Sequence, residues 1–355
     1  MRSTLPQKAD SRYSSRIEVA HMFRIGLVSR WHVHSHKPDE RYVKEFLSIP
    51  DCVITCVWDK DPAVAETWAA EFGVTAERDL ETLLSREDVD GILVTSAAAD
   101  HREIFIAAAK HKKHIFTEKV LALTLEDAYA IRDAIKASGV KFCISFMRLG
   151  IKQLAYAKTL VEDGVLGTPV QFRCLCGHRG GLNGDLPEYW YDPDITGGGA
   201  MIDLGFNAAY LARYIMGGME SVSSSFGDAI LHKRVEDNAS CNVRFESGAM
   251  GLIDATFTSP CMSVFELAVY GTDGAYYTRF GGGDMAELHR NGEKIREIPL
   301  EEIPAGPDTP VRTWVKACTE GGSDALYGID AAVDMVRFMV AAYRSHADGG
   351  RRTII

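Results

Sequence analysis

Short apolar runs alternate regularly with helix-period stretches over the first 145 residues, and this alternation constrains the fold more than any other feature of the sequence. The apolar runs are typical of strands buried on both faces, and the stretches between them are long enough to be crossover helices. The predicted strands are 23–28, 52–59, 91–96, 114–119 and 141–146, and the predicted helices are 38–48, 62–71, 79–86, 100–110 and 124–138. Such alternation predicts an α/β domain with a doubly wound parallel sheet.

The pattern changes after about residue 147, where strand-like runs are joined by short turns such as Thr272–Gly274. Strands joined in this way pair antiparallel, so we predict an α+β domain with a mainly antiparallel sheet. Its predicted helices are 148–163, 200–216 and 308–346, and its predicted strands are 221–229, 238–246, 249–258, 263–271 and 275–280. The chain therefore divides into an N-terminal extension (1–22), a first domain (23–147) and a second domain (148–355), whose last helices could pack back on the first.

Composition excludes several classes of protein. The formal net charge of −10 gives no basic surface for nucleic acid or an anionic membrane, and no apolar run is long enough to span a bilayer. The polar N-terminal stretch lacks the apolar core of a signal peptide, and the eight cysteines contain no C-x-x-C pair, so we expect reduced thiols in a cytoplasmic protein. Cys174, Cys176 and His178 would share one side of a strand, but no fourth ligand stands out, and we expect no metal.

Asp59 ends the second predicted strand, where an acidic residue can accept hydrogen bonds from the adenosine ribose hydroxyls of a dinucleotide. A carboxylate there would repel a 2′-phosphate, which favours NAD over NADP. Lys60 could instead pair with such a phosphate. The alternative is that Asp59 belongs to a helix cap before Pro62.

The turn after the first strand lacks the glycines that bring backbone N–H groups close to a pyrophosphate. Trp31 stands where the middle glycine would be. The following helix N-terminus still offers free N–H groups, and Arg30, His32 and His34 could add donors. The alternative is a surface turn without a ligand.

Two longer segments add to this pattern. VTSAAADHREIFIAAAKHKKHIFTEK (94–119) and GGGAMIDLGFNAAYLARYIMGG (197–218) resemble, in order and spacing, the Gfo/Idh/MocA family of glucose–fructose oxidoreductases and inositol dehydrogenases. The resemblance covers about residues 23–346. It implies a Rossmann dinucleotide-binding domain followed by a domain that binds substrate and forms oligomers.

The resemblance also implies roles for individual residues. The family's E-K-P motif supplies a lysine near the nicotinamide and the reacting hydroxyl, which Lys119 matches although Val120 replaces the proline. Asp203 matches the aspartate of the glycine-rich motif, and Asn207 stands where its histidine would be. The cofactor-binding residues that we predict are Ser29, Arg30, Trp31, His32, Asp59, Ser96, His101 and Glu118. His34, at the third glycine position, also departs from the family pattern.

The predicted catalytic residues are Lys119, Asp203, Asn207 and His178. Oxidation of a hydroxyl requires a group that takes its proton, and asparagine cannot shuttle one at neutral pH, so this task would fall to Lys119, His178 or a tyrosine. A surface ion pair of Lys119 with Glu118 is the alternative for that lysine. The predicted substrate-binding residues are Arg148, His178, Arg179, Tyr189, Tyr191, Asp203 and Asn207. An ordinary loop with an aromatic cluster remains the alternative for those between 177 and 192.

These features favour an NAD-dependent oxidoreductase that transfers hydride between the nicotinamide and a sugar, inositol or glycoside hydroxyl. One alternative is an NAD-dependent glycosidase that oxidises its sugar transiently and eliminates the aglycone. Another is an inactive relative that binds a sugar or a partner. We also expect a homo-oligomer, as in the family, with Val264, Leu267 and Val269 as a weak indication of an apolar sheet face.

Overall fold

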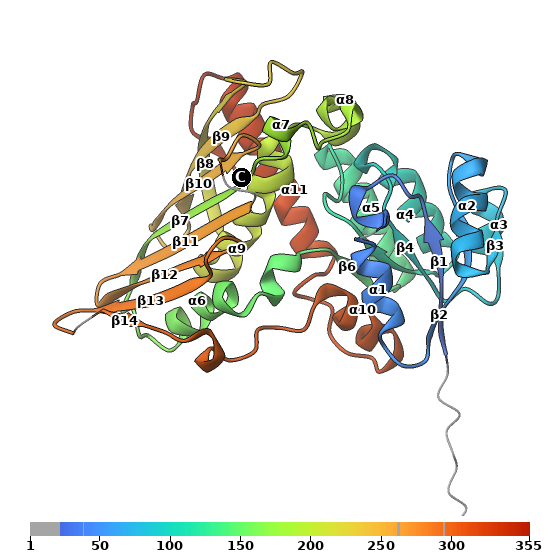
Figure 1. Cartoon of the computed structure of the whole chain (residues 1–355), viewed down its shortest axis with the longest axis horizontal. Helices are drawn as coiled ribbons and strands as arrows, with labels where there is room; N and C mark the ends of the chain where they lie inside the picture. The colour runs from blue at the N-terminus through green and yellow to red at the C-terminus, as the bar shows by residue number, and fades with distance from the viewer. Residues whose placement is uncertain (1–21, 38, 261–262, 294) are drawn as a thin grey trace, which may run out of the picture.

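The computed structural model describes residues 22–37, 39–260, 263–293 and 295–355. Except for Met22, the predicted N-terminal extension lies outside the described residues. Two domains lie side by side, each built on one sheet (Figure 1).

The first domain contains a six-stranded parallel sheet in the order β3-β2-β1-β4-β5-β6. Its strands are β1 (Phe23–Val28), β2 (Cys52–Trp58), β3 (Thr75–Ala76), β4 (Gly91–Val94), β5 (His114–Thr117) and β6 (Phe142–Ile144). Its helices are α1 (Arg41–Leu47), α2 (Pro62–Phe72), α3 (Leu80–Ser85), α4 (His101–Lys110) and α5 (Leu125–Ser138). The predicted doubly wound sheet is confirmed, with β3 as an additional edge strand. The strand order reverses between β1 and β4, and ligands bind at the C-terminal ends of such strands.

Local sequence signals explain where these helices begin and end. Asp61 accepts a hydrogen bond from the N–H of Ala63 and caps α2, which begins with Pro62. Thr124 caps α5 in the same way, and Gly139 ends that helix in the left-handed conformation (φ 73°).

The second domain contains a nine-stranded sheet in the order β14-β13-β12-β11-β7-β10-β9-β8-β15. Its strands are β7 (Pro169–His178), β8 (Met219–Gly227), β9 (Asn238–Phe245), β10 (Met250–Thr256), β11 (Ser263–Gly271), β12 (Gly274–Phe280), β13 (Met285–Arg290), β14 (Arg296–Glu297) and β15 (Thr353–Ile354). Its helices are α6 (Lys152–Glu162), α7 (Gly180–Asn183), α8 (Pro193–Thr196), α9 (Phe206–Met216), α10 (Pro310–Thr319) and α11 (Ile329–Ala347). Strands β7 and β10 pair in parallel and the other neighbouring strands of this sheet pair antiparallel, which confirms a mainly antiparallel sheet.

One face of this sheet carries α6, α9 and α11, and the opposite face carries no helix in the described part of the chain (Figure 1). Along β11, Phe265, Leu267 and Val269 are buried on the helix-covered side. Of the residues taken from the sequence as an indication of an exposed apolar face, Leu267 and Val269 therefore belong to the core. Val264 alternates with them and faces the other way.

The C-terminal helices contact both domains. Helix α11 packs against β8 of the second sheet and against α5 and β6 of the first domain, and α10 packs against α1, β5 and β6. Trp314 of α10 is fully buried against Phe23, with the ring centroids 5.2 Å apart. These contacts fix the two sheets relative to each other.

Among the described residues, seven cysteines occur and none is joined in a disulfide. No helix in this part of the chain combines the length and apolar character needed to cross a membrane.

Candidate active site between the two domains

A hollow of about 400 Å³, open solvent at its mouth included, lies between the domains at the C-terminal edge of the first sheet. We call it the interdomain hollow. It is lined by Trp31, His32, Ser96, Ala98, Lys119, Val120, Trp190, Thr196, Gly198, Ile202 and Asp203. Both domains contribute, so the hollow has the location expected for a site where a cofactor meets a substrate.

Lys119 and Asp203 form an ion pair inside this hollow. Lys119 follows β5, and its Nζ lies 2.5 Å from Asp203 Oδ1 and 2.9 Å from the backbone oxygen of Asp203. Their side chains are only 11% and 17% exposed. Burial alone would raise the pKa of Asp203, but the Lys119 ammonium holds it at about 2. Asp203 is therefore ionised at neutral pH, as a counter-ion for Lys119.

Close backbone packing places Asp203 at this position. Asp203 lies in a π-helical turn, Met201–Gly205, that leads into α9. The preceding glycines allow close contacts, because a Cβ on Gly198 would lie 1.9 Å from the Tyr343 hydroxyl and one on Gly199 would lie 2.0 Å from the Glu236 carbonyl oxygen. The glycine-rich motif thus brings the aspartate of the second domain to the lysine of the first.

Glu118 is buried beside this pair and is held by several side chains. Its Oε2 accepts hydrogen bonds from the hydroxyls of Tyr42 and Ser145, and its Oε1 lies 3.5 Å from His32 Nε2. Ser145 also accepts a hydrogen bond of 3.0 Å from the backbone N–H of Lys119. Burial, then the nearby charges of His34 and Lys119, place the pKa of His32 well below its usual value, so its ring is neutral. Sequence reasoning missed Tyr42, which reads as one more apolar residue of a helix.

The turn after β1 keeps a glycine-like backbone without glycine. Ser29 has the left-handed conformation (φ 62°), and the next N–H, of Arg30, donates to Asp59 Oδ2 at 2.7 Å. The Arg30 guanidinium is buried and pairs with Glu71 at 2.8 Å and Glu40 at 3.4 Å. The charge of Arg30 thus anchors the turn, and its role as a donor to a cofactor stays a prediction.

Trp31, at the middle glycine position, extends its ring away from the turn to the second domain. The ring stacks on that of Trp190 with a centroid distance of 5.3 Å and an angle of 9°. The Tyr189 hydroxyl donates to the Trp31 carbonyl oxygen at 3.2 Å. Trp190 Nε1 donates in turn to Asp203 Oδ2 at 3.4 Å. Trp190 belongs to the aromatic stretch 189–191 of the sequence, but it is not among the predicted site residues.

Groups that fit a nicotinamide dinucleotide lie at the ends of β2 and β4. Ser96 Oγ and His101 Nε2 are buried without a hydrogen-bond partner among the described residues. Asp59 lies at the end of β2, where each carboxylate oxygen accepts one backbone N–H, from Arg30 or Asp61. A carboxylate oxygen can accept more than one hydrogen bond, so the ribose role predicted for Asp59 is compatible with its turn role. The unpaired atoms of Ser96 and His101 are the kind that a bound cofactor satisfies.

The remaining predicted residues lie around the hollow rather than in its lining. His178 ends β7 and stacks on Phe257, close enough to Asp203 for its charge to act on that carboxylate. Arg179 follows it and has a buried Nε without a described partner. Asn207 donates to the carbonyl oxygens of Asp203 and Leu204, as a residue of its own helix.

Two predicted substrate contacts are directed elsewhere. The guanidinium of Arg148 lies over Phe265 and Phe280, 5.8 and 5.5 Å from the ring centroids. The Lys233 ammonium lies over the Tyr191 ring, 5.1 Å from its centroid. Both side chains make intramolecular contacts outside the hollow lining, and their roles in substrate binding stay predictions.

A parallel sheet of order 3-2-1-4-5-6, combined with a lysine–aspartate pair at its C-terminal edge, defines a two-domain NAD-binding oxidoreductase. The chain belongs to the GFO/IDH/MocA oxidoreductase family. The profile described as "Oxidoreductase family, NAD-binding Rossmann fold" matches residues 32–146, and the profile "GFO/IDH/MocA C-terminal domain" matches residues 154–277.

Relatives of known name agree with this assignment. Myo-inositol 2-dehydrogenase of Thermotoga maritima is 30% identical over 308 residues, covering 81% of this chain and 87% of that protein. The 2,7-anhydro-N-acetylneuraminate hydratase of Mediterraneibacter gnavus is 28% identical over 173 residues, covering 49% of this chain and 46% of the hydratase. Among solved structures, levoglucosan dehydrogenase in complex with NADH has the same fold, with a TM-score of 0.82 at 22% identity over 94% of this chain and 99% of that one.

Proposed function

We propose that this enzyme oxidises a hydroxyl of a neutral cyclic polyol or sugar with NAD, and that Lys119 holds the reacting oxygen. The observation that carries the proposal is the Lys119–Asp203 pair in a hollow that both domains line. The myo-inositol dehydrogenase relative supports a polyol as the substrate class.

The charge of the lining favours a neutral substrate. Lys119 is the only lysine or arginine among the lining residues, and Asp203 balances its charge. A phosphorylated sugar or a sugar acid would need a further cation to offset its charge. The stacked rings of Trp31 and Trp190 offer an apolar surface of the kind that packs against the C–H face of a sugar ring.

The ion pair also defines what Lys119 can do. A carboxylate at 2.5 Å stabilises the ammonium form, which donates hydrogen bonds and cannot accept a proton. Lys119 therefore orients the hydroxyl, and during oxidation it can take the hydroxyl proton only as it passes one of its own protons to Asp203 Oδ1. Carbonyl reduction runs the same two proton transfers in reverse. Asp59, Ser96 and His101 would hold the cofactor, whose nicotinamide exchanges the hydride with the substrate carbon when it is bound.

A second candidate is a redox-neutral reaction in which the sugar is oxidised only transiently. The hydratase relative favours it, because hydration of its anhydrosugar involves no net oxidation. In that case the hollow must also supply an acid or base for bond cleavage, and the candidates are His32, which lines it, and His178, which acts on Asp203.

The first experiment is a titration with NADH and NADPH that follows quenching of tryptophan fluorescence. Saturable binding that is tighter for NADH is the expected result. A panel of inositols, anhydrosugars and glycosides with NAD then separates the candidates. Net NADH formation supports the dehydrogenase, and product formation without NADH supports the redox-neutral reaction. Absence of binding for both cofactors would overturn both.

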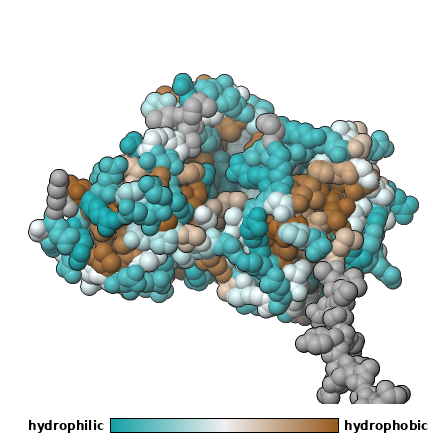
Figure 2. Space-filling model, turned by 60° about the horizontal axis from the view of Figure 1, so that its bottom comes forward, coloured by the Kyte–Doolittle hydropathy of each residue, from teal (hydrophilic) through white to brown (hydrophobic). Residues whose placement is uncertain are grey.

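We further propose that the enzyme is a homo-oligomer whose subunits meet at the helix-free face of the second sheet. Met250 is 44% exposed on β10, and Leu252 follows it on the same face, where it borders a shallow hollow with Leu175 of β7 and Ala268 of β11. Figure 2 shows apolar surface on both domains. Light scattering at micromolar concentration should give at least twice the monomer mass, and a Met250→Lys/Leu252→Lys variant should shift it toward the monomer.

A further inference from the structure

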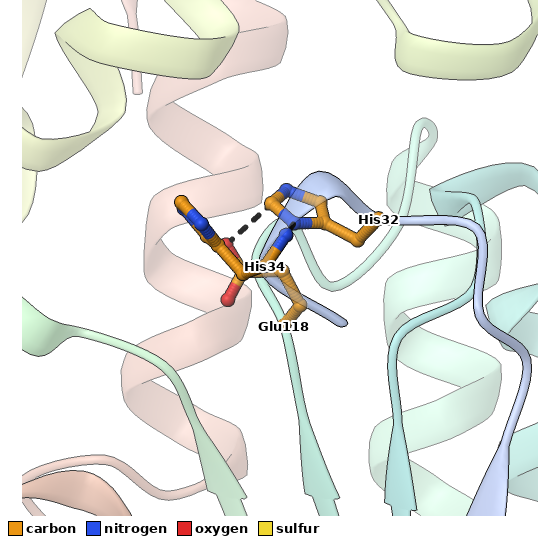
Figure 3. Close-up of side chains that lie close together, drawn as sticks. All are labelled: His32, His34 and Glu118. Carbon is orange, nitrogen blue, oxygen red and sulfur yellow. Dashed lines mark hydrogen bonds and ion pairs between the residues drawn. The ribbon is translucent and has the colours of Figure 1, made fainter. Parts of the chain in front are cut away.

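Two imidazoles and a carboxylate converge beside the interdomain hollow (Figure 3). His32 and His34 come from the turn after β1, and Glu118 follows β5. One ligand atom of each lies within 4.8 Å of the other two, and His32 Nε2 is 3.5 Å from Glu118 Oε1. Two ligand atoms on a tetrahedral zinc ion, bonded at about 2.0–2.1 Å, are themselves about 3.4 Å apart. The His32–Glu118 spacing already matches this edge.

The surroundings leave one ligand atom available on His34 and one on Glu118. His34 Nδ1 lies 2.7 Å from Asp39 Oδ2, which leaves its Nε2 available. Glu118 uses Oε2 for the hydroxyls of Tyr42 and Ser145, which leaves Oε1. Carboxylates and hydroxyls in this position orient the ligands of metal sites and fix the histidine tautomer. Asp39, Tyr42 and Ser145 thus hold the ligand side chains of the cluster in place.

His32 requires one rearrangement. Its Nδ1 accepts a hydrogen bond of 3.1 Å from the backbone N–H of His34, so without a metal its proton is on Nε2 and points to Glu118. Coordination through Nε2 moves this proton to Nδ1, and the bond from His34 is given up. The loss of one neutral hydrogen bond is small beside the binding free energy of a zinc ion at a three-ligand site.

We propose that His32, His34 and Glu118 bind a divalent transition-metal ion of the zinc type. Two histidines and one glutamate form a ligand set that leaves a fourth position open. His32 also lines the hollow that contains Lys119 and Asp203, so the open position is available to water or to a substrate hydroxyl there. The proposal goes beyond the redox function and does not depend on it, and it differs from the sequence-based expectation of no metal.

The test is a titration of the untagged, full-length, chelator-treated protein with Zn²⁺ and with Co²⁺, without cofactor. Calorimetry should give one ion per chain, and Co²⁺ should develop the visible absorption of a low-symmetry site with nitrogen ligands. His34→Ala should weaken binding by about 100-fold or more, and Asp39→Asn, which acts through His34, by about 10-fold. His34 and Asp39 are both partly exposed, so these variants should fold.

His36→Ala is the matched control, because His36 is exposed in the same turn but lies outside the cluster. It should leave affinity and stoichiometry unchanged. Lack of binding by the wild type, or binding that His34→Ala leaves unchanged, would overturn the proposal. Thermal melts of each variant separate lost ligation from lost folding.

Discussion

The two sides of the interdomain hollow differ in how closely their residues keep the family motifs. On one side, Lys119 and Asp203 keep the residue types that the family motifs predict, and they form a close ion pair. On the other side, the turn between β1 and α1 has Ser29, Trp31 and His34 at three positions where the family pattern has glycine. The first side retains its chemistry, and the second has been rebuilt around different side chains.

The rebuilt turn shows how glycine positions can be filled without loss of the fold. Ser29 adopts the left-handed backbone that a glycine would take more easily. Trp31 places its ring on Trp190, outside the turn. His34 places its Nδ1 2.7 Å from Asp39 Oδ2, and Arg30 anchors the turn to Glu71. Each substitution is thus accommodated by a specific conformation or contact, and the retained side needs no such compensation.

The largest effect is expected for Lys119→Met on the retained side. Loss of the group that orients and protonates the reacting oxygen should lower kcat by about 10²–10⁴-fold. NADH affinity should change by less than about threefold, since the lysine acts on the substrate. Lys158→Met, on the surface of α6, is the control in the same steady-state assay. Full activity in Lys119→Met would assign proton transfer to another group.

The next effect is on stability. Asp203→Asn leaves the Lys119 ammonium buried without its counter-ion, which should cost about 3 kcal/mol in the free energy of unfolding. The double variant Lys119→Met/Asp203→Asn should recover part of this loss, as urea denaturation can show. Equal losses in the single and double variants would contradict coupling between the two side chains.

The same pair predicts a pH dependence. The pKa of Asp203 falls from its ordinary value of 3.8 to about 2 in the folded protein. A carboxyl with a lowered pKa contributes stability that is complete above pH 4 and is lost as pH falls toward 2. Acid denaturation of Asp203→Asn should therefore show a shallower loss across that window than the wild type.

More of the retained side than of the rebuilt side could be predicted from the sequence. The alternation of strands and helices predicted the first sheet, strand-like runs joined by short turns predicted the second, and the family motifs brought Lys119 and Asp203 into one site. The partners of Arg30 could not be predicted, because Glu71 lies 41 residues away and its pairing depends on how α2 packs. For the same reason the contact of Trp31 with Trp190, across two domains, left no local signal in the sequence.

Trp31→Ala tests whether the rebuilt side serves the substrate. Loss of the ring that stacks on Trp190 should raise KM for the sugar by about fivefold, with kcat changed by less than about twofold, because stacking contributes about 0.5–1.5 kcal/mol. Trp31→Phe should restore most of the affinity. Tighter NADH binding in Trp31→Ala would instead mean that the ring obstructs the cofactor.

The smallest effect is expected for Ser29→Gly, which restores the first glycine of the turn. A left-handed residue other than glycine costs about 1–2 kcal/mol, and glycine gives back about 0.5–1 kcal/mol through its greater freedom in the unfolded chain, so the net gain should be about 0.5 kcal/mol. Asp51→Gly is the matched control, since Asp51 has the same conformation (φ 60°) at the opposite end of the sheet. Both variants should raise the thermal midpoint by about 1 °C. Of the two variants, only Ser29→Gly can change NADH affinity. A change of more than about twofold would show that the serine side chain itself contacts the cofactor. Equal affinity would mean that Ser29 has only the backbone role that a glycine would have.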